Sequence, residues 1–123
     1  MGLFSATETK IETVERDYAP VLIDGERVLI AFKAVRDLVF LTNLRLCTVN
    51  VQGLTGRKVE IESIPYRSIV RWSIERAGTF DMDADLLVWM SGSDSPLEVK
   101  VAAGANIVAV QQVLARHILG AVR

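Results

Sequence analysis

The chain has 123 residues and a formal net charge of -1 at pH 7, from 14 Lys and Arg against 15 Asp and Glu. This is the length of one domain with a sizeable core, and the balanced charge excludes a strong net field toward nucleic acid or anionic membranes. Half of the residues are hydrophobic, which is a large share for a small monomer. The single cysteine, Cys47, cannot form an internal disulfide, so we expect a reducing, cytoplasmic setting.

The first 20 residues predict an extension with one short helix. Residues 9–12, "TKIE", have the form of a capping box, and Pro20 is a helix stop. Ile11, Val14 and Tyr18 follow at helical spacing, so they predict the buried face. The opening "MGLFSATETK" lacks the basic start and apolar run of a secretory signal, and no window is apolar enough to span a membrane.

Residues 27–101 predict antiparallel strands. Apolar and polar residues alternate in short runs, and the glycines of "QGLTGR" mark a hairpin turn. The predicted strands cover residues 28–33, 37–42, 44–51, 58–63, 70–75, 82–90 and 97–101. In the sixth strand, Leu86 and Val88 are expected to face the core, while Leu87 and Trp89 face outward.

Residues 106–120 predict a C-terminal helix, with Asn106 as its N-cap and Gly120 as its stop. One narrow apolar stripe is formed by Ile107, Val110, Leu114 and Ile118. Seven strands and one final helix predict a single mainly β (α+β) domain over residues 1–123. We expect a bent antiparallel sheet or open barrel whose end or side is plugged by this helix.

Three aspartates at alternate positions, Asp81, Asp83 and Asp85, raise the question of a metal site. A calcium loop of the EF-hand type needs Gly at its sixth position and Glu at its twelfth, where this chain has Leu86 and Gly92. In a strand, residues two apart project to the same side. The pattern therefore favours a solvated strand face, and we predict no metal site.

Other chemistry-bearing residues stand alone. His117, the only histidine, lies beside the apolar stripe of the predicted helix without metal ligands at suitable spacing. Cys47 lies in the middle of a strand, where a cysteine is usually a small buried hydrophobe. No phosphate-binding or nucleophile motif occurs. We therefore predict no catalytic residue and no cofactor, and the aromatic residues lack the basic stripe of a nucleic-acid platform.

The chain resembles the bacterial pleckstrin-homology (PH-like) domain family over nearly its whole length. The resemblance is carried by "YAPVLIDGERV", "FKAVRDLVFLTNLRL", "QGLTGRKVE", "SIPYRSIVRWSIERAGTFDMDADLLVWMSG" and the helical tail. It implies a strongly bent seven-stranded antiparallel sheet in two halves, capped by a C-terminal helix. It also implies a ring-forming homo-oligomer. The basic cluster of phosphoinositide-binding members is incomplete here, because Asp37 and Leu38 follow Lys33 and Arg36.

These patterns predict a non-enzymatic binding or scaffold module that self-associates, as a cyclic homo-oligomer, and presents a surface to an unknown protein partner. Apolar residues on predicted outer faces form the expected interface: Leu87, Trp89, Val108, Ala115, Leu119 and Val122. Scattered surface apolar residues are also normal in monomers, and this alternative stays open. A second alternative is a peripheral lipid-binding module with an anion patch at Lys33, Arg36 and Arg45.

Overall fold

The structure is a computed structural model that describes residues 7–34, 37–76, 83–102 and 105–120. Within these ranges the chain forms eight strands and two α-helices. In chain order they are β1 (Thr7–Glu8), α1 (Ile11–Asp17), β2 (Val28–Ala34), β3 (Asp37–Thr42), β4 (Arg45–Gln52), β5 (Lys58–Pro65), β6 (Ile69–Arg76), β7 (Ala84–Met90), β8 (Leu97–Val101) and α2 (Ile107–Leu114).

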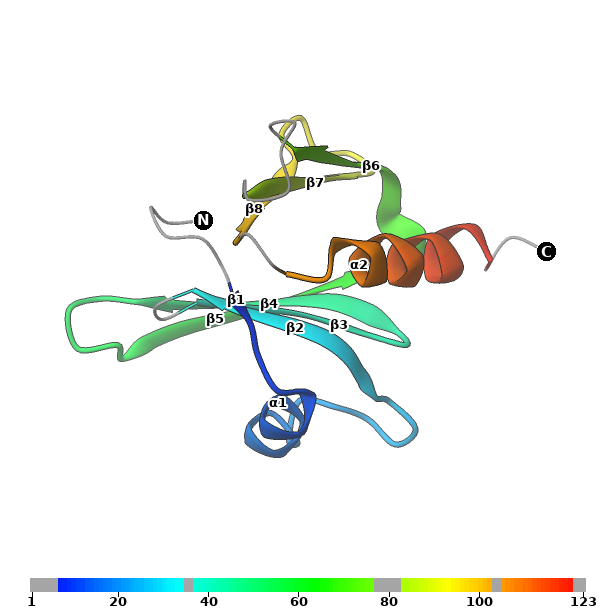
Figure 1. Cartoon of the computed structure of the whole chain (residues 1–123). Helices are drawn as coiled ribbons and strands as arrows, with labels where there is room; N and C mark the ends of the chain where they lie inside the picture. Colours follow the sequence, from blue (N-terminus) through cyan, green and yellow to red (C-terminus); the bar gives the residue numbers. More distant parts are fainter. Residues whose placement is uncertain (1–6, 35–36, 77–82, 103–104, 121–123) are drawn as a thin grey trace.

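The strands form two antiparallel sheets, one with the order β1-β2-β3-β4-β5 and the other with the order β6-β7-β8. Helix α2 lies between the two sheets, and α1 covers the opposite face of the five-stranded sheet (Figure 1). The predicted mainly β fold with a plugging C-terminal helix is confirmed. β1 was not predicted, because two residues are too short to show a strand period.

The inner core lies between the two sheets and α2. Alternation along β7 buries Leu86 and Val88, as predicted, and α2 contributes Val110 and Leu114. The side chain of Asn106 accepts a hydrogen bond from the backbone N–H of Ala109 at 3.0 Å, which confirms the predicted N-cap. The helix continues as a π-helical turn over Ala115–Leu119 before Gly120.

A second apolar cluster lies on the outer face of the five-stranded sheet, under α1. Val14 is buried there, and Ile11 and Tyr18 pack against the same cluster, as their spacing predicted. The predicted capping box is wrong. The helix begins at Ile11, and the N–H of Thr9 donates to the carbonyl of Ala31 at 2.9 Å, because the chain still pairs with β2 at this point.

Candidate interaction surfaces

The outer face of the three-stranded sheet carries the described part of the aspartate run. Asp85 lies between Glu75 and Lys100 in register, and its carboxylate is 2.9 Å from the Lys100 ammonium. The hydrogen bond that the Lys100 ammonium donates to Asp85, together with the negative charges of Asp85 and the nearby Asp83, raises the pKa of Lys100. Asp83 is exposed, whereas Asp81 lies outside the described residues. Asp85 thus acts as an ion-pair partner on a solvated strand face.

Farther along the same face, two predicted interface residues are half-buried. Leu87 faces Ser73 on β6 and Glu98 on β8. The guanidinium of Arg71 lies over the ring of Trp89, 4.1 Å from the ring centroid. The pair is a cation–π contact, which shields the indole from solvent. Leu87 and Trp89 therefore face outward as predicted, but charged neighbours border them.

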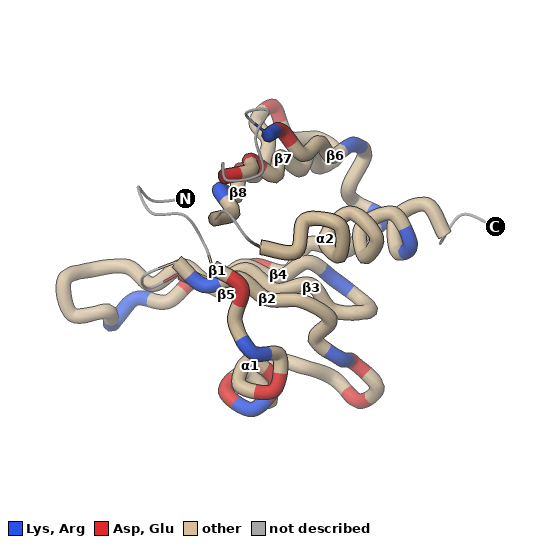
Figure 2. Tube along the Cα trace, viewed as in Figure 1, with Lys and Arg blue, Asp and Glu red and all other residues tan. Residues whose placement is uncertain are grey.

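Helix α2 and its π-helical continuation present a more open apolar surface. Val108 and Leu119 are 68% and 61% exposed, and Ala115 is partly buried; Val122 lies outside the described residues. Figure 2 shows that α2 is uncharged over its first turns. An open groove of about 420 Å³ runs between the helix and Leu29 of β2, with Val108 and Arg116 among its lining residues.

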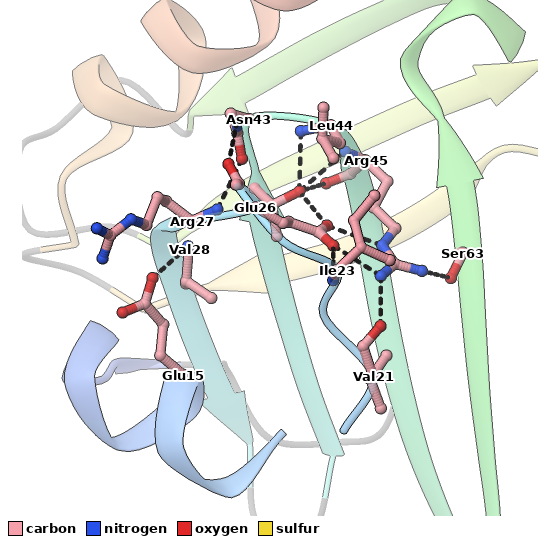
Figure 3. A network of polar contacts seen from close by, with 12 residues as sticks. Glu15, Val21, Ile23, Glu26, Arg27, Val28, Asn43, Leu44, Arg45 and Ser63 are labelled. Carbon is pink, nitrogen blue, oxygen red and sulfur yellow. Dashed lines mark hydrogen bonds and ion pairs between the residues drawn. The ribbon is translucent and has the colours of Figure 1, made fainter. Parts of the chain in front are cut away.

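Arg45, which belongs to the predicted anion patch, lies in a polar network at the start of β4 (Figure 3). Its Nε and Nη2 atoms each donate to one oxygen of the Glu26 carboxylate, both at 2.8 Å. Nη1 donates to the Ser63 hydroxyl at 2.9 Å, and Nη2 also donates to the carbonyl of Val21 at 2.6 Å. The guanidinium is therefore already bound by groups of its own chain.

Glu26 is the buried centre of this network. Its two oxygens accept two further hydrogen bonds, from the Ile23 N–H at 3.1 Å and from the Thr42 hydroxyl at 2.7 Å. The hydrogen bonds from Arg45 lower the pKa of Glu26 to about 2, against the opposing effect of burial. The network ties the loop before β2 to the hairpin between β3 and β4.

The structure does not bring together the basic residues predicted as an anion patch. Lys33 pairs with Leu38, which pairs with Val49, and Val49 is four residues beyond Arg45 on β4. At the rise of a β-strand this separates Lys33 from Arg45 by roughly 13 Å along the sheet alone. Arg36 lies outside the described residues. The sequence predicted Arg45 as part of the patch from its position across the hairpin. That spacing gives no sign that a buried carboxylate binds the guanidinium.

His117 and Cys47 occupy the structural positions that their surroundings in the sequence predicted. The imidazole stacks on the ring of Tyr66, with centroids 5.2 Å apart, and its Nδ1 lies 2.8 Å from the carbonyl of Val113. The Cys47 side chain is fully buried in the outer cluster, and burial raises the pKa of its thiol. A protonated, buried thiol is a poor nucleophile.

The described residues contain no group of three or more His, Cys, Asp and Glu placed to hold a metal ion. Within the same ranges, none of the helices is both long and apolar enough to cross a bilayer.

Sequence reasoning missed two features. Glu26 stands in "IDGER", which reads as a solvated turn, and no local signal marks its burial. Val59 and Ile61 lie in the strand predicted over residues 58–63, and among the described residues that strand, β5, is an edge strand on which both are exposed, at 49% and 41%. Edge position depends on which strands pair, so single-strand periodicity carries no information about it.

Known proteins resemble this chain over nearly its full length. The family model for the bacterial PH domain matches residues 1–118. The Bacillus subtilis (strain 168) protein YjqA is 44% identical over 114 residues, which are 92% of this chain and 91% of that protein. YozO from the same organism is 30% identical over 118 residues, 96% of this chain and 98% of that protein.

Two solved structures also match at high coverage. A Shewanella loihica PV-4 protein with a pleckstrin-homology domain has a TM-score of 0.84 and 36% identity, over 94% of this chain and 98% of that one. A pleckstrin homology domain from Shewanella amazonensis SB2B has a TM-score of 0.73 and 42% identity, over 90% of this chain and 100% of that one. Sequence, fold and coverage agree, and the chain belongs to the bacterial PH domain family.

Proposed function

We propose that the protein is a non-enzymatic PH-like module that self-associates into a cyclic homo-oligomer and presents a surface to a protein partner. The main support is the exposure of Val108 on α2 and of Leu119 on its π-helical continuation, a helix whose other side already fills the inner core. Neither Val108 nor Leu119 takes part in that core, and exposed apolar residues close together on one surface favour association with another chain.

The energetic gain is sufficient for association if several such residues are covered. Covering the exposed parts of Val108 and Leu119 contributes about 1 to 2 kcal/mol for each side chain, before the cost of ordering two chains. These two residues alone do not hold two copies together. The interface therefore extends to further surface, for which Leu87 and Trp89 on β7 are the predicted contributors.

The absence of enzymatic function is supported by the state of the reactive groups. Cys47 is buried, His117 is engaged with Tyr66 and Val113, and Glu26 is held by Arg45. Cys47 and Glu26 are closed off from solvent, and His117, which lines the groove beside α2, is the one of the three that stays partly exposed. A cytoplasmic location, suggested by the single free cysteine, stays a prediction.

Light scattering of the wild type and two variants tests the proposal. We expect a mass of several subunits for the wild type and a lower mass for Leu119→Asp, with unchanged circular dichroism. Ile23→Asp is the matched control, because Ile23 is 63% exposed but lies in the loop before β2. A wild type that stays a single subunit at high concentration would refute self-association.

Pelleting with anionic phosphatidylserine vesicles distinguishes the lipid-binding alternative from the proposed function. Strong binding that disappears at high salt would favour a peripheral membrane module instead.

A further inference from the structure

The exposed side of the C-terminal helix is apolar and positively charged. Val108 and Leu119 are exposed, and Arg116 lies one turn before Leu119 and lines the same open groove as Val108. Residues 105–120 contain no Asp or Glu, and Arg116 is their only Lys or Arg. Among the described residues, its guanidinium has no hydrogen bond or ion pair. A chain that covers this surface therefore needs apolar side chains beside a negative charge.

Strand β5 carries this combination. Val59 and Ile61 are exposed on one face of the strand, and Glu60 and Glu62 alternate with them. Because β5 is an edge strand among the described residues, side chains of both faces border its free edge. Within the same residues neither glutamate has an ion pair. Lys58 stands at the start of the strand, so its negative charge is confined to residues 60–62.

The two surfaces lie on opposite faces of the five-stranded sheet. Val59 and Ile61 pair with Val51 and Val49 of the outer apolar cluster, so they face the side on which α1 lies. Helix α2 lies on the other face (Figure 1). The helix therefore cannot cover the outer face of β5 in its own chain, and both surfaces are open to a second copy.

The other exposed apolar residues match a cationic helix less well. Among the large apolar residues that are exposed in the described chain, only Val59 and Ile61 stand two positions apart, as side chains on one strand face do. Val70 directly precedes Arg71, and the guanidinium of Arg71 covers the ring of Trp89. A positive charge at that place repels a cationic helix. β5 is therefore the best counterpart on this chain.

We infer that the C-terminal helix of one copy binds the outer face of β5 of the next copy. Val108 and Leu119 cover the apolar side chains of β5, and Arg116 lies beside its glutamates. The inference rests on the proposed self-association and adds β5 to the predicted interface. Since the two surfaces differ, each copy uses its helix toward one neighbour and its β5 toward the other. Contacts of this head-to-tail kind generate a ring when the rotation closes.

Mixing two variants, each of which has lost one surface, tests the contact. Leu119→Asp places a charge on the helix, and Ile61→Asp places one on β5. Both positions are exposed, so the fold should persist in circular dichroism. We expect each variant alone to sediment as a single subunit. An equimolar mixture should form pairs and no ring, because the Ile61→Asp copy supplies an intact helix and the Leu119→Asp copy an intact β5.

Val70→Asp is the matched control, since Val70 is 66% exposed on β6, outside both surfaces. It should keep the mass of the wild type. Three results would overturn the β5 contact and leave self-association intact, provided that the wild type is oligomeric. They are an Ile61→Asp variant of wild-type mass, a mixture that stays at one subunit, and a Val70→Asp variant that dissociates as Ile61→Asp does. A monomeric wild type would overturn both proposals.

Charge reversal gives an independent measurement. Arg116→Glu places a like charge beside Glu60 and Glu62, so we expect the concentration of half-association in sedimentation to rise about three- to tenfold. Adding Glu60→Lys and Glu62→Lys to the same chain restores opposite charges and should bring this concentration back to within about twofold of the wild type. An Arg116→Glu variant that associates normally, or a triple variant no tighter than Arg116→Glu, would contradict the pairing of helix and strand.

Discussion

The ion pair between Glu26 and Arg45 makes a quantitative prediction about acid stability. The pKa of Glu26 is lowered from 4.5 to about 2 in the folded state. Because a depressed carboxyl pKa stabilises the fold above its unfolded value, the contribution is present above about pH 4.5 and is lost as the pH falls toward 2. At 1.36 kcal/mol per pH unit, the full contribution is about 3 kcal/mol.

The variant Glu26→Gln isolates this contribution, because it keeps the size of the side chain and removes the titrating group. The free energy of unfolding of each protein is measured by urea denaturation at fixed protein concentration, at a series of pH values. The difference between wild type and Glu26→Gln should shrink by about 2 kcal/mol between about pH 6 and about pH 3, as linkage requires for the two pKa values.

The value of that difference at neutral pH is not the test, since the variant also loses hydrogen bonds from Arg45. Its change with pH is the test, because the other titrating groups are common to both proteins. A difference that stays constant over this range would show that Glu26 has an ordinary pKa, and the bidentate contact in Figure 3 would then not persist in solution.

Three further predictions concern the fold. Asn106→Ala removes the cap of α2 and should lower the free energy of unfolding by about 1 kcal/mol in urea denaturation; no loss would mean that the cap contributes nothing. Leu114→Ala, at a fully buried position, should cost about 2 to 5 kcal/mol, whereas Val108→Ala, at a 68% exposed one, should cost far less; equal losses would contradict the assigned faces of α2. Asp83→Asn should leave calcium content and melting temperature nearly unchanged, and a calcium-dependent melting shift in the wild type that this variant lacks would restore the metal interpretation.

Much of the fold was predictable because its signals are local. Alternation in "ADLLVWM" identified the buried face of β7, and the spacing of Val110 and Leu114 identified the inner face of α2. Asn106 was recognisable as an N-cap from its place before the helical period. Each of these signals depends on neighbours within a few residues, so one sequence suffices to read them.

Thr9 shows where a local signal failed. Its place three residues before a glutamate is typical of a capping box, but the hydrogen bond of its N–H to Ala31 extends the pairing of β1 with β2. A contact with a residue 22 positions away in the sequence overrode a local preference. Arg45 shows the same kind of long-range effect, since its guanidinium is bound to Glu26 from a distant loop.

The sequence by itself determined the mainly β class, the terminal helix and the faces of the strands, because hydrophobic periodicity acts within each element. Only the tertiary structure decided that β5 is an edge strand among the described residues, that the C-terminal helix retains exposed apolar residues and that Arg45 is engaged by a buried carboxylate. Those properties depend on which strands and loops, far apart in the chain, come to lie side by side. That arrangement decides which polar groups find a hydrogen-bond partner and which apolar side chains are buried.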